Sequence, residues 1–148
     1  MSRVTVVCGP PGSGKTSYVG QRAAWGDLIL DMDTLYQALS GRGWYDKPPG
    51  LLSYVFAARD GALKRLEARR DADAWIVTGG ALRKDREELR GRFDAEVIVL
   101  ETSAVTCLLR IAEDERRVGQ LEEWMPRVLS WWQEYEPSDA DTVIRVEG

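Results

Sequence analysis

Short apolar runs alternate with helix-like segments along this chain, and the alternation predicts a parallel sheet joined by crossover helices. The first run covers residues 4–8 and is almost continuously apolar, as in a strand that is buried on both faces. Further strands are expected at residues 28–30, 74–78, 95–100 and 142–144. The pattern predicts a three-layer α/β fold, with five strands in one sheet and helices on both of its faces.

Helices are expected over residues 14–24, 34–40, 51–70, 84–92, 103–115 and 122–136. In the third of these, helical spacing gathers five apolar residues: Leu52, Val55, Phe56, Leu63 and Leu66. In the fifth, four side chains are expected to point inward: Val105, Leu108, Leu109 and Ile111. Pro126 is compatible with the first turns of the last helix, where its missing N–H costs little. No internal repeat or linker is visible, so we expect one domain over 1–148.

The composition is that of an ordinary globular protein, with 44% apolar and 30% charged residues. The chain has no histidine, which excludes Ser-His-Asp hydrolases, histidine general bases and nearly all zinc enzymes. Cys8 and Cys107 lie in apolar segments without partner spacing, so both are expected to be reduced and buried. No apolar stretch approaches the roughly 18 residues of a membrane span, and no cleavable leader is evident. We therefore expect a cytoplasmic protein with no membrane partner.

The net charge of −4 is unevenly distributed. Residues 101–148 carry five basic residues against eleven acidic ones, so the acidic excess belongs to the last third of the chain. A strongly basic nucleic-acid-binding protein would have an excess of basic over acidic residues. The charge distribution of this chain is still compatible with a local basic groove.

One glycine-rich segment carries a specific chemical signature. The sequence Gly9-Pro10-Pro11-Gly12-Ser13-Gly14-Lys15-Thr16 fits the pattern G-x-x-x-x-G-K-[ST] and lies between a buried strand and a helix. Its glycines let backbone N–H groups turn toward a phosphate, and the start of the helix adds partial positive charge. Lys15 would reach the β- and γ-phosphates of ATP, and the Thr16 hydroxyl would hold Mg²⁺. These eight residues and Ser17 form the predicted ATP site.

An acidic pair follows the second predicted strand. The chain has no Asn-Lys-x-Asp motif of the kind that reads guanine, and its third strand ends in Gly79-Gly80 rather than in paired acids. Asp31 and Asp33 instead flank Met32, a placement typical of small P-loop kinases. One carboxylate can accept the proton of an acceptor hydroxyl, and the other can hold Mg²⁺ through water. We expect Asp33 to act on the acceptor and Asp31 to support it or the metal; alternatively, Asp33 caps the next helix.

Arginines lie between the fourth and fifth predicted strands, where small kinases carry a lid over the γ-phosphate. Arg110 precedes the acidic run 113–115, and Arg116 and Arg117 follow it. An arginine in a lid neutralises the charge that develops during transfer and helps to exclude water. The sequence therefore predicts a small helical lid over about 110–124, with Arg116 or Arg117 on the transferred group. The alternative is a solvated helix face with local ion pairs.

Taken in order, residues 9–16, Asp31-Met32-Asp33 with Tyr36-Gln37, and Arg110 with Arg116-Arg117-Val118-Gly119 resemble the bacteriophage polynucleotide 5′-kinase domain. Small kinases of the zeta-toxin type form the wider group. The resemblance implies that Asp33 is the general base for a 5′-hydroxyl, that Arg116 or Arg117 binds the phosphate, and that Arg110 lies near the nucleotide. We expect the five strands in the order 2-3-1-4-5.

This chain departs from that family at two places on the acceptor side. The family's acceptor-binding arginine corresponds to Tyr36, and its polar turn after the third strand corresponds to Thr78-Gly79-Gly80. The acceptor can therefore differ from a polynucleotide end. The residues expected to contact it are Asp33, Tyr36, Thr78, Gly79 and Arg83, the last at the carboxyl edge of the sheet, where α/β domains bind ligands.

Other residues near the expected acceptor site have two interpretations each. Trp44 and Tyr45 could stack a base or anchor their loop over the core. The basic residues Arg59, Lys64, Arg65, Arg69 and Arg70 could meet phosphates or form an ordinary helix surface. Lys84, Arg86 and Arg90 follow Gly79-Gly80 at the carboxyl edge of the sheet, where α/β domains bind ligands. Three tryptophans of the last helix, Trp124, Trp131 and Trp132, are expected in the core rather than against a ligand.

The residues together predict an enzyme that transfers the γ-phosphoryl of ATP in line to a hydroxyl, with ATP and Mg²⁺ as cofactors. Three functions stay open. The first is a nucleic-acid hydroxyl kinase, with DNA or RNA ends as partners. The second is a kinase for a nucleoside, sugar or nucleotide-sugar. The third is a non-catalytic protein in which the bound nucleotide controls a partner.

Overall fold

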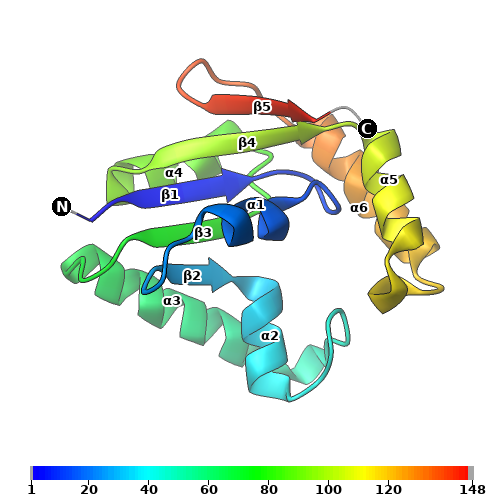
Figure 1. The fold of residues 1–148 in the computed structure, drawn as a ribbon, viewed down its shortest axis with the longest axis horizontal. Coiled ribbons are helices and arrows are strands. Elements are labelled where there is room, and N and C mark those ends of the chain that lie inside the picture. The colour runs from blue at the N-terminus through cyan, green and yellow to red at the C-terminus, as the bar shows by residue number, and fades with distance from the viewer. Residues whose placement is uncertain (1, 147–148) are drawn as a thin grey trace.

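The computed structural model describes residues 2–146 and contains five parallel strands in one sheet. The strand order is β2-β3-β1-β4-β5, as Figure 1 shows. The central strand β1 (Val4–Cys8) lies between β3 (Ala74–Thr78) and β4 (Glu96–Thr102). The edge strands are β2 (Leu28–Asp31) and β5 (Thr142–Val146). The fold class and strand order predicted from the sequence are confirmed.

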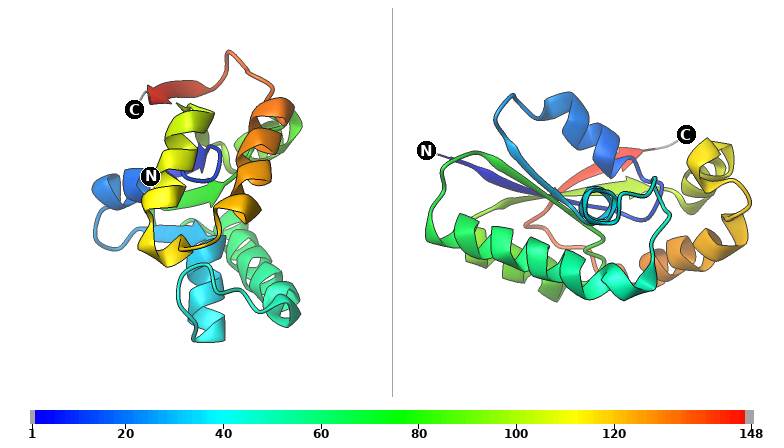
Figure 2. Two further views of the ribbon diagram at one scale, coloured as in Figure 1. Left: turned by 90° about the vertical axis from the view of Figure 1, so that its right-hand side faces the viewer. Right: turned by 90° about the horizontal axis from the view of Figure 1, so that it is seen from below.

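Six α-helices cover the two faces of this sheet: α1 (Lys15–Arg22), α2 (Met32–Ser40), α3 (Leu52–Ala68), α4 (Arg83–Phe93), α5 (Ala104–Glu113) and α6 (Leu121–Glu134). Two short 3₁₀ turns, η1 (Pro49–Leu51) and η2 (Glu115–Arg117), complete the described chain. Figure 2 shows α1 on one face of the sheet and α3, α4 and α6 on the other. Alternate residues of β1 serve the two faces, since Val6 packs in the core beneath α3 and α4 and Val7 packs beneath α1.

Helices α5 and α6 extend past the carboxyl ends of the strands (Figure 1) and pack on each other. Their shared core contains Cys107, Ile111, Trp124 and Val128. The prediction that Val105 and Leu109 point inward is wrong, because they are 68% and 58% exposed. Cys107 and Ile111 stand one turn apart and define the packed side of α5, against which Leu108 also packs, and this leaves Val105 and Leu109 exposed.

Helix α3 shows a similar difference from the expected apolar face. Leu63 and Leu66 lie in the main core, whereas Leu52 and Phe56 are exposed. The first turns of α3 lie beside α2 rather than under the sheet (Figure 1), so less of their surface is covered. Pro126 also lies deeper in α6 than expected, because the helix starts at Leu121 and places this proline in its second turn.

A buried arginine joins α4 to the segment before β5. The Arg86 side chain is fully buried, and its Nε lies 2.9 Å from Asp141 Oδ2. Its Nη1 donates to Gly80 O at 2.8 Å and to Ala81 O at 2.9 Å. Arg90 forms an ion pair with the same aspartate. The Arg86 guanidinium is therefore bound by protein oxygens inside the fold rather than by a ligand at the carboxyl edge of the sheet.

Cys8 and Cys107 are free thiols and buried, as predicted. Burial raises the pKa of Cys8 to about 12 and that of Cys107 to about 11, so both are protonated near neutral pH. Among residues 2–146, no helix is both long enough and apolar enough to cross a membrane.

Candidate active site

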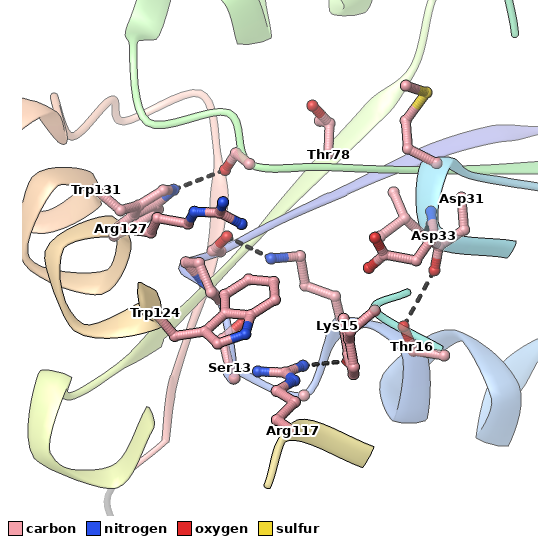
Figure 3. Close-up of a pocket in the computed structure, with 18 of the residues that line it drawn as sticks. Ser13, Lys15, Thr16, Asp31, Asp33, Thr78, Arg117, Trp124, Arg127 and Trp131 are labelled. Carbon is pink, nitrogen blue, oxygen red and sulfur yellow. Dashed lines mark hydrogen bonds between the residues drawn. The ribbon is translucent and has the colours of Figure 1, made fainter. Parts of the chain in front are cut away.

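The carboxyl ends of β1, β2 and β3 open into a cleft of about 980 Å³ that the α5–α6 pair closes from the far side. Figure 3 shows Lys15 near its centre, with Thr16, Asp31 and Asp33 on one side and Trp124 and Arg127 on the other. This is the edge where ligands bind in open α/β sheets, since loops from several neighbouring strands meet there.

The loop between β1 and α1 requires glycine at two positions. Gly12 has a φ of +78° and Gly14 a φ of +96°, both in the left-handed region. A Cβ at Gly12 would lie 2.8 Å from Cys107 O, so a larger residue would push the loop away from α5. The loop then leads directly into α1 at Lys15, whose first-turn N–H groups have no partners within the helix. Such a loop fits a phosphate chain.

Lys15 crosses this loop from the first turn of α1. Its Nζ donates to Gly9 O at 2.6 Å and to Pro10 O at 3.0 Å. Burial of the ammonium lowers the pKa of Lys15 to about 8, against the opposing effect of Asp33 and Asp31. A buried cation in this position suits the phosphates of a nucleotide. Their negative charge would replace the favourable interactions with water that the ammonium loses when it is buried.

This lowered pKa predicts a pH effect on nucleotide binding. The ammonium is lost as the pH rises through about 8, so we expect the Kd for ATP, measured without Mg²⁺, to rise roughly tenfold between pH 7 and pH 9. Isothermal titration at several pH values measures this directly. Lys15→Arg is the control, since a guanidinium stays charged and the dependence should disappear. An unchanged Kd for the native protein over the same range would contradict the assignment.

Thr16 and Asp31 form the polar pair beside Lys15. The Thr16 hydroxyl donates to Asp31 Oδ2 at 3.1 Å. Asp31 is buried, and both burial and the neighbouring Asp33 raise the pKa of its carboxyl. Within residues 2–146, no three carboxylate or thiol groups come together as a metal site. The pair fits Mg²⁺ carried by a nucleotide, since hydroxyl and carboxylate oxygens suit this ion and phosphates would supply the remaining ligands.

Asp33 is the second residue of α2 and faces the same cleft. Its Oδ1 accepts a hydrogen bond from Lys47 Nζ in the loop that precedes η1. The alternative role considered for Asp33, capping α2, belongs to Asp31, whose Oδ1 accepts from Asp33 N at 3.0 Å. The Asp33 carboxylate is about one third exposed and is therefore accessible to a hydroxyl that enters the cleft.

The three lid arginines differ in their surroundings. Arg110 lies over the phosphate loop and donates from Nη1 to Ser13 O at 3.1 Å. The Arg116 side chain is half exposed and is held by Asp114, with 2.9 Å between Nε and Oδ1. Arg117 is only 9% exposed, and its Nη1 has no hydrogen-bond partner among the described residues. Between the two candidates, Arg117 is therefore the buried one, with a donor that no described residue binds.

Most residues predicted for the site line this one cleft. They are Gly9, Pro11, Gly12, Ser13, Gly14, Lys15, Thr16, Ser17, Asp31, Asp33, Thr78, Gly79, Arg110, Arg116 and Arg117. Three others do not line it: Pro10, Tyr36 and Arg83. Tyr36 is buried and donates to Pro48 O at 3.0 Å, and Arg83 donates to Pro137 O behind the sheet edge. Tyr36 thus anchors the acceptor-side loop rather than contacting the cleft.

The structure adds cleft residues that the sequence did not single out. Lys47 and Arg127 are two such cations, and Phe56 is an exposed aromatic at the cleft. Trp124 and Trp131 are buried as expected but also line the cleft, where Trp131 Nε1 donates to Gly79 O at 2.8 Å. The apolar spacing of α6 predicts which side of the helix is packed. It does not predict that this side also lines the cleft.

This arrangement has counterparts among solved protein structures. No family model and no curated protein matches the sequence. Solved structures do match it. A gluconokinase from Sinorhizobium meliloti 1021 has a TM-score of 0.64 and 18% identity over 99% of this chain and 83% of its own. A shikimate kinase from Acinetobacter baumannii, solved with shikimate, has a TM-score of 0.58 and 23% identity over 100% of this chain and 86% of its own.

A third similar structure comes from the Pnkp1/Rnl/Hen1 RNA repair complex. It has a TM-score of 0.60 and 12% identity over 91% of this chain, which spans 46% of the matched chain. Identities this low establish the fold, and the three structures agree on it. Together with the phosphate loop, the strand order and the helical pair above the cleft, they show that this chain has the fold of the small P-loop kinases.

Proposed function

We propose that this chain is an ATP-dependent phosphotransferase that moves the γ-phosphoryl group of ATP to a hydroxyl of a small, negatively charged acceptor. One observation carries the proposal: the phosphate loop, the Asp33 carboxylate and the Arg117 guanidinium line the same cleft. These groups are a donor site, a proton acceptor and a cation for the transferred group, which is the set that phosphoryl transfer requires. The gluconokinase and shikimate kinase of the same fold act on small acceptors by name and support this choice.

In the proposed reaction, Asp33 accepts the proton of the acceptor hydroxyl while its oxygen attacks the γ-phosphorus of ATP. The new O–P bond forms as the bond from the γ-phosphorus to the bridging oxygen breaks, and ADP leaves with that electron pair. Lys15 and the loop N–H groups hold the phosphates, and Arg117 neutralises charge on the transferred group. Thr16 and Asp31 would hold Mg²⁺, which supplies further charge neutralisation when bound.

Cations that line the cleft favour an acceptor that itself carries negative charge. Lys47, Arg59 and Arg127 line the cleft together with the lid arginines. By contrast, the other basic residues of the α3 region do not line it, and Arg65 and Arg69 form ion pairs with Asp71. Positive charge is therefore concentrated inside the cleft rather than along α3 as a track for a long backbone. This distribution suits a hydroxylated carboxylate or phosphate ester.

A polynucleotide 5′-hydroxyl is the second candidate acceptor, and the aromatic residues favour it. Tyr45 lines the cleft, and its ring centroid lies 5.9 Å from that of Trp44. Arg116 lies over the Trp44 ring at 5.1 Å. An aromatic pair with an adjacent guanidinium can stack a nucleobase. One of the similar structures belongs to an RNA repair complex, in keeping with this alternative.

An acceptor screen tests the proposal. The native protein is incubated with Mg²⁺ and ATP labelled at the γ-phosphorus, together with either hydroxy acids and sugar acids or 5′-hydroxyl oligonucleotides. Label on a small anion supports the first candidate, and label on oligonucleotide ends supports the second. ATP that binds but transfers no label to either group, nor to a small-molecule cell extract, would contradict the kinase assignment and favour a nucleotide-binding protein without transfer.

Lys47 provides a test of the anionic acceptor. Lys47→Met removes a charged hydrogen-bond donor from the cleft, so we expect the KM for the acceptor to rise about tenfold or more. The Kd for ATP should stay within about twofold, because Lys47 binds Asp33 rather than the phosphate loop. Lys64→Met, on the outer part of α3, is the control and should change neither value. A Lys47→Met protein with an unchanged KM would contradict this role.

A further inference from the structure

Tyr45 has an unusual backbone conformation. Within residues 2–146, only Tyr45 and Asp94 have a positive φ without being glycine, at +63° and +48°. Asp94 ends α4, where a left-handed residue is common. Tyr45 lies in the loop between α2 and η1 and has no such role, and a bulky residue is unfavourable in this region. Strain of this kind persists where the surroundings hold the residue in place and often accompanies a functional site.

The Tyr45 side chain is held against the lid arginine. Its hydroxyl accepts a hydrogen bond from Arg117 Nη2, and the guanidinium carbon lies 3.9 Å from its ring centroid. Trp124 meets the Tyr45 ring edge to face at 5.2 Å, and its own ring centroid lies 4.5 Å from the guanidinium carbon. The guanidinium thus lies against two aromatic rings that also contact each other, with Nη1 left without a hydrogen bond to the described residues. Asp114 Oδ2 lies 3.4 Å from Arg117 Nε, and the two rings restrict the orientation of the guanidinium further.

The same loop also contacts the acceptor side. Lys47, two residues after Tyr45, binds the Asp33 carboxylate, and Pro48 O accepts the Tyr36 hydroxyl at 3.0 Å. The segment 45–48 therefore joins the expected base, helix α2 and the lid arginine. A displacement of this loop would move Lys47 and Tyr45 together.

From these contacts we infer that Tyr45 is a positioning residue that orients the Arg117 guanidinium toward the transferred phosphoryl group and links the lid to the acceptor-side loop. The inference rests on the proposed function. Tyr45 does not itself exchange a proton or bind the phosphate; it acts through Arg117. The strained backbone places its ring under the guanidinium, and its hydroxyl then leaves Nη1 as the donor for a phosphoryl oxygen.

A double-mutant cycle tests this role. Tyr45→Phe keeps the ring but removes the hydroxyl that accepts from Arg117, so we expect kcat to fall about tenfold with the Kd for ATP unchanged. In an Arg117→Met background, the same change should have less than about a twofold effect, because the group that Tyr45 positions is gone. Tyr54→Phe is the matched control, since it removes the hydroxyl of an exposed tyrosine in α3 that does not line the cleft, and it should leave kcat unchanged.

A second readout needs no turnover. Aluminium fluoride with ADP and Mg²⁺ mimics the transferred group, and Tyr45→Phe should weaken the binding of this complex about tenfold while ADP alone binds as before. Equal effects of Tyr45→Phe in both backgrounds, or an unchanged affinity for the fluoride complex, would overturn the positioning role. A native protein that binds the fluoride complex in a Tyr45-dependent way but transfers to no acceptor would instead overturn the proposed function.

Discussion

Replacing Asp33 by asparagine is expected to lower phosphoryl transfer about 1,000-fold, because the amide keeps the shape of the carboxylate but cannot accept the hydroxyl proton. The Kd for ATP should stay within about twofold, since neither Thr16 nor Lys15 hydrogen-bonds to Asp33. Steady-state transfer and nucleotide titration on the same preparation measure both values.

Asp46→Asn is the matched control for this substitution. Asp46 precedes Lys47 in the loop between α2 and η1. Its side chain is exposed and forms an ion pair with Arg42. Its loss should change transfer by less than about twofold, as expected of a surface ion pair. Transfer that survives in the Asp33→Asn protein at a rate close to that of the native protein would remove Asp33 from the reaction. A large loss of ATP affinity would instead indicate a disturbed phosphate loop.

Replacing Arg86 by methionine is expected to lower the free energy of unfolding by about 3–5 kcal/mol, the usual cost of breaking a buried ion pair from one side. The substitution would leave Asp141 without its buried partner and would remove the donors to Gly80 O and Ala81 O. Since the adjacent Gly79 O accepts hydrogen bonds from Gly9 N and Trp131, the edge of the cleft should loosen as well. Urea unfolding followed by tryptophan fluorescence measures the stability.

Two further variants distinguish the stability lost by breaking a buried ion pair from the stability lost by removing any arginine side chain. Arg92→Met removes a partly exposed arginine that pairs with Glu67, and it should cost no more than about 1 kcal/mol. Combining Arg86→Met with Asp141→Leu should recover part of the stability, because no buried charge is then left alone. An Arg86→Met protein as stable as the native one would contradict the structural role of this arginine.

The sequence was sufficient to predict the sheet and most of the residues that line the cleft around Lys15. Nearly continuous apolar runs such as Val4–Cys8 are typical of strands that are buried on both faces, and helices between such strands favour a parallel arrangement. The phosphate loop was predictable because its function depends on local backbone geometry, which Gly12 and Gly14 encode within a few residues. Asp31 and Asp33 were found for a similar reason, since they follow a strand end directly.

The acceptor side could not be predicted in the same way, because it is assembled from distant segments. Lys47 lies in a loop without periodicity, and its contact with Asp33 spans fourteen positions of the chain. The sequence could not distinguish the surroundings of Arg116 and Arg117; in the structure Arg116 is half exposed, whereas Arg117 is buried and hydrogen-bonds to Tyr45. Apolar spacing alone also misplaced Val105 and Leu109, since it does not specify which side of α5 meets α6.

The most direct test of phosphoryl transfer follows the γ-phosphorus of ATP in the native protein and in Asp33→Asn, with the small-molecule extract as the acceptor pool and Mg²⁺ present. The account predicts a labelled phosphate monoester that phosphatase treatment releases, formed by the native protein and about 1,000-fold more slowly by the variant. Label that stays on ATP, or appears only as inorganic phosphate at equal rates in both proteins, would contradict it.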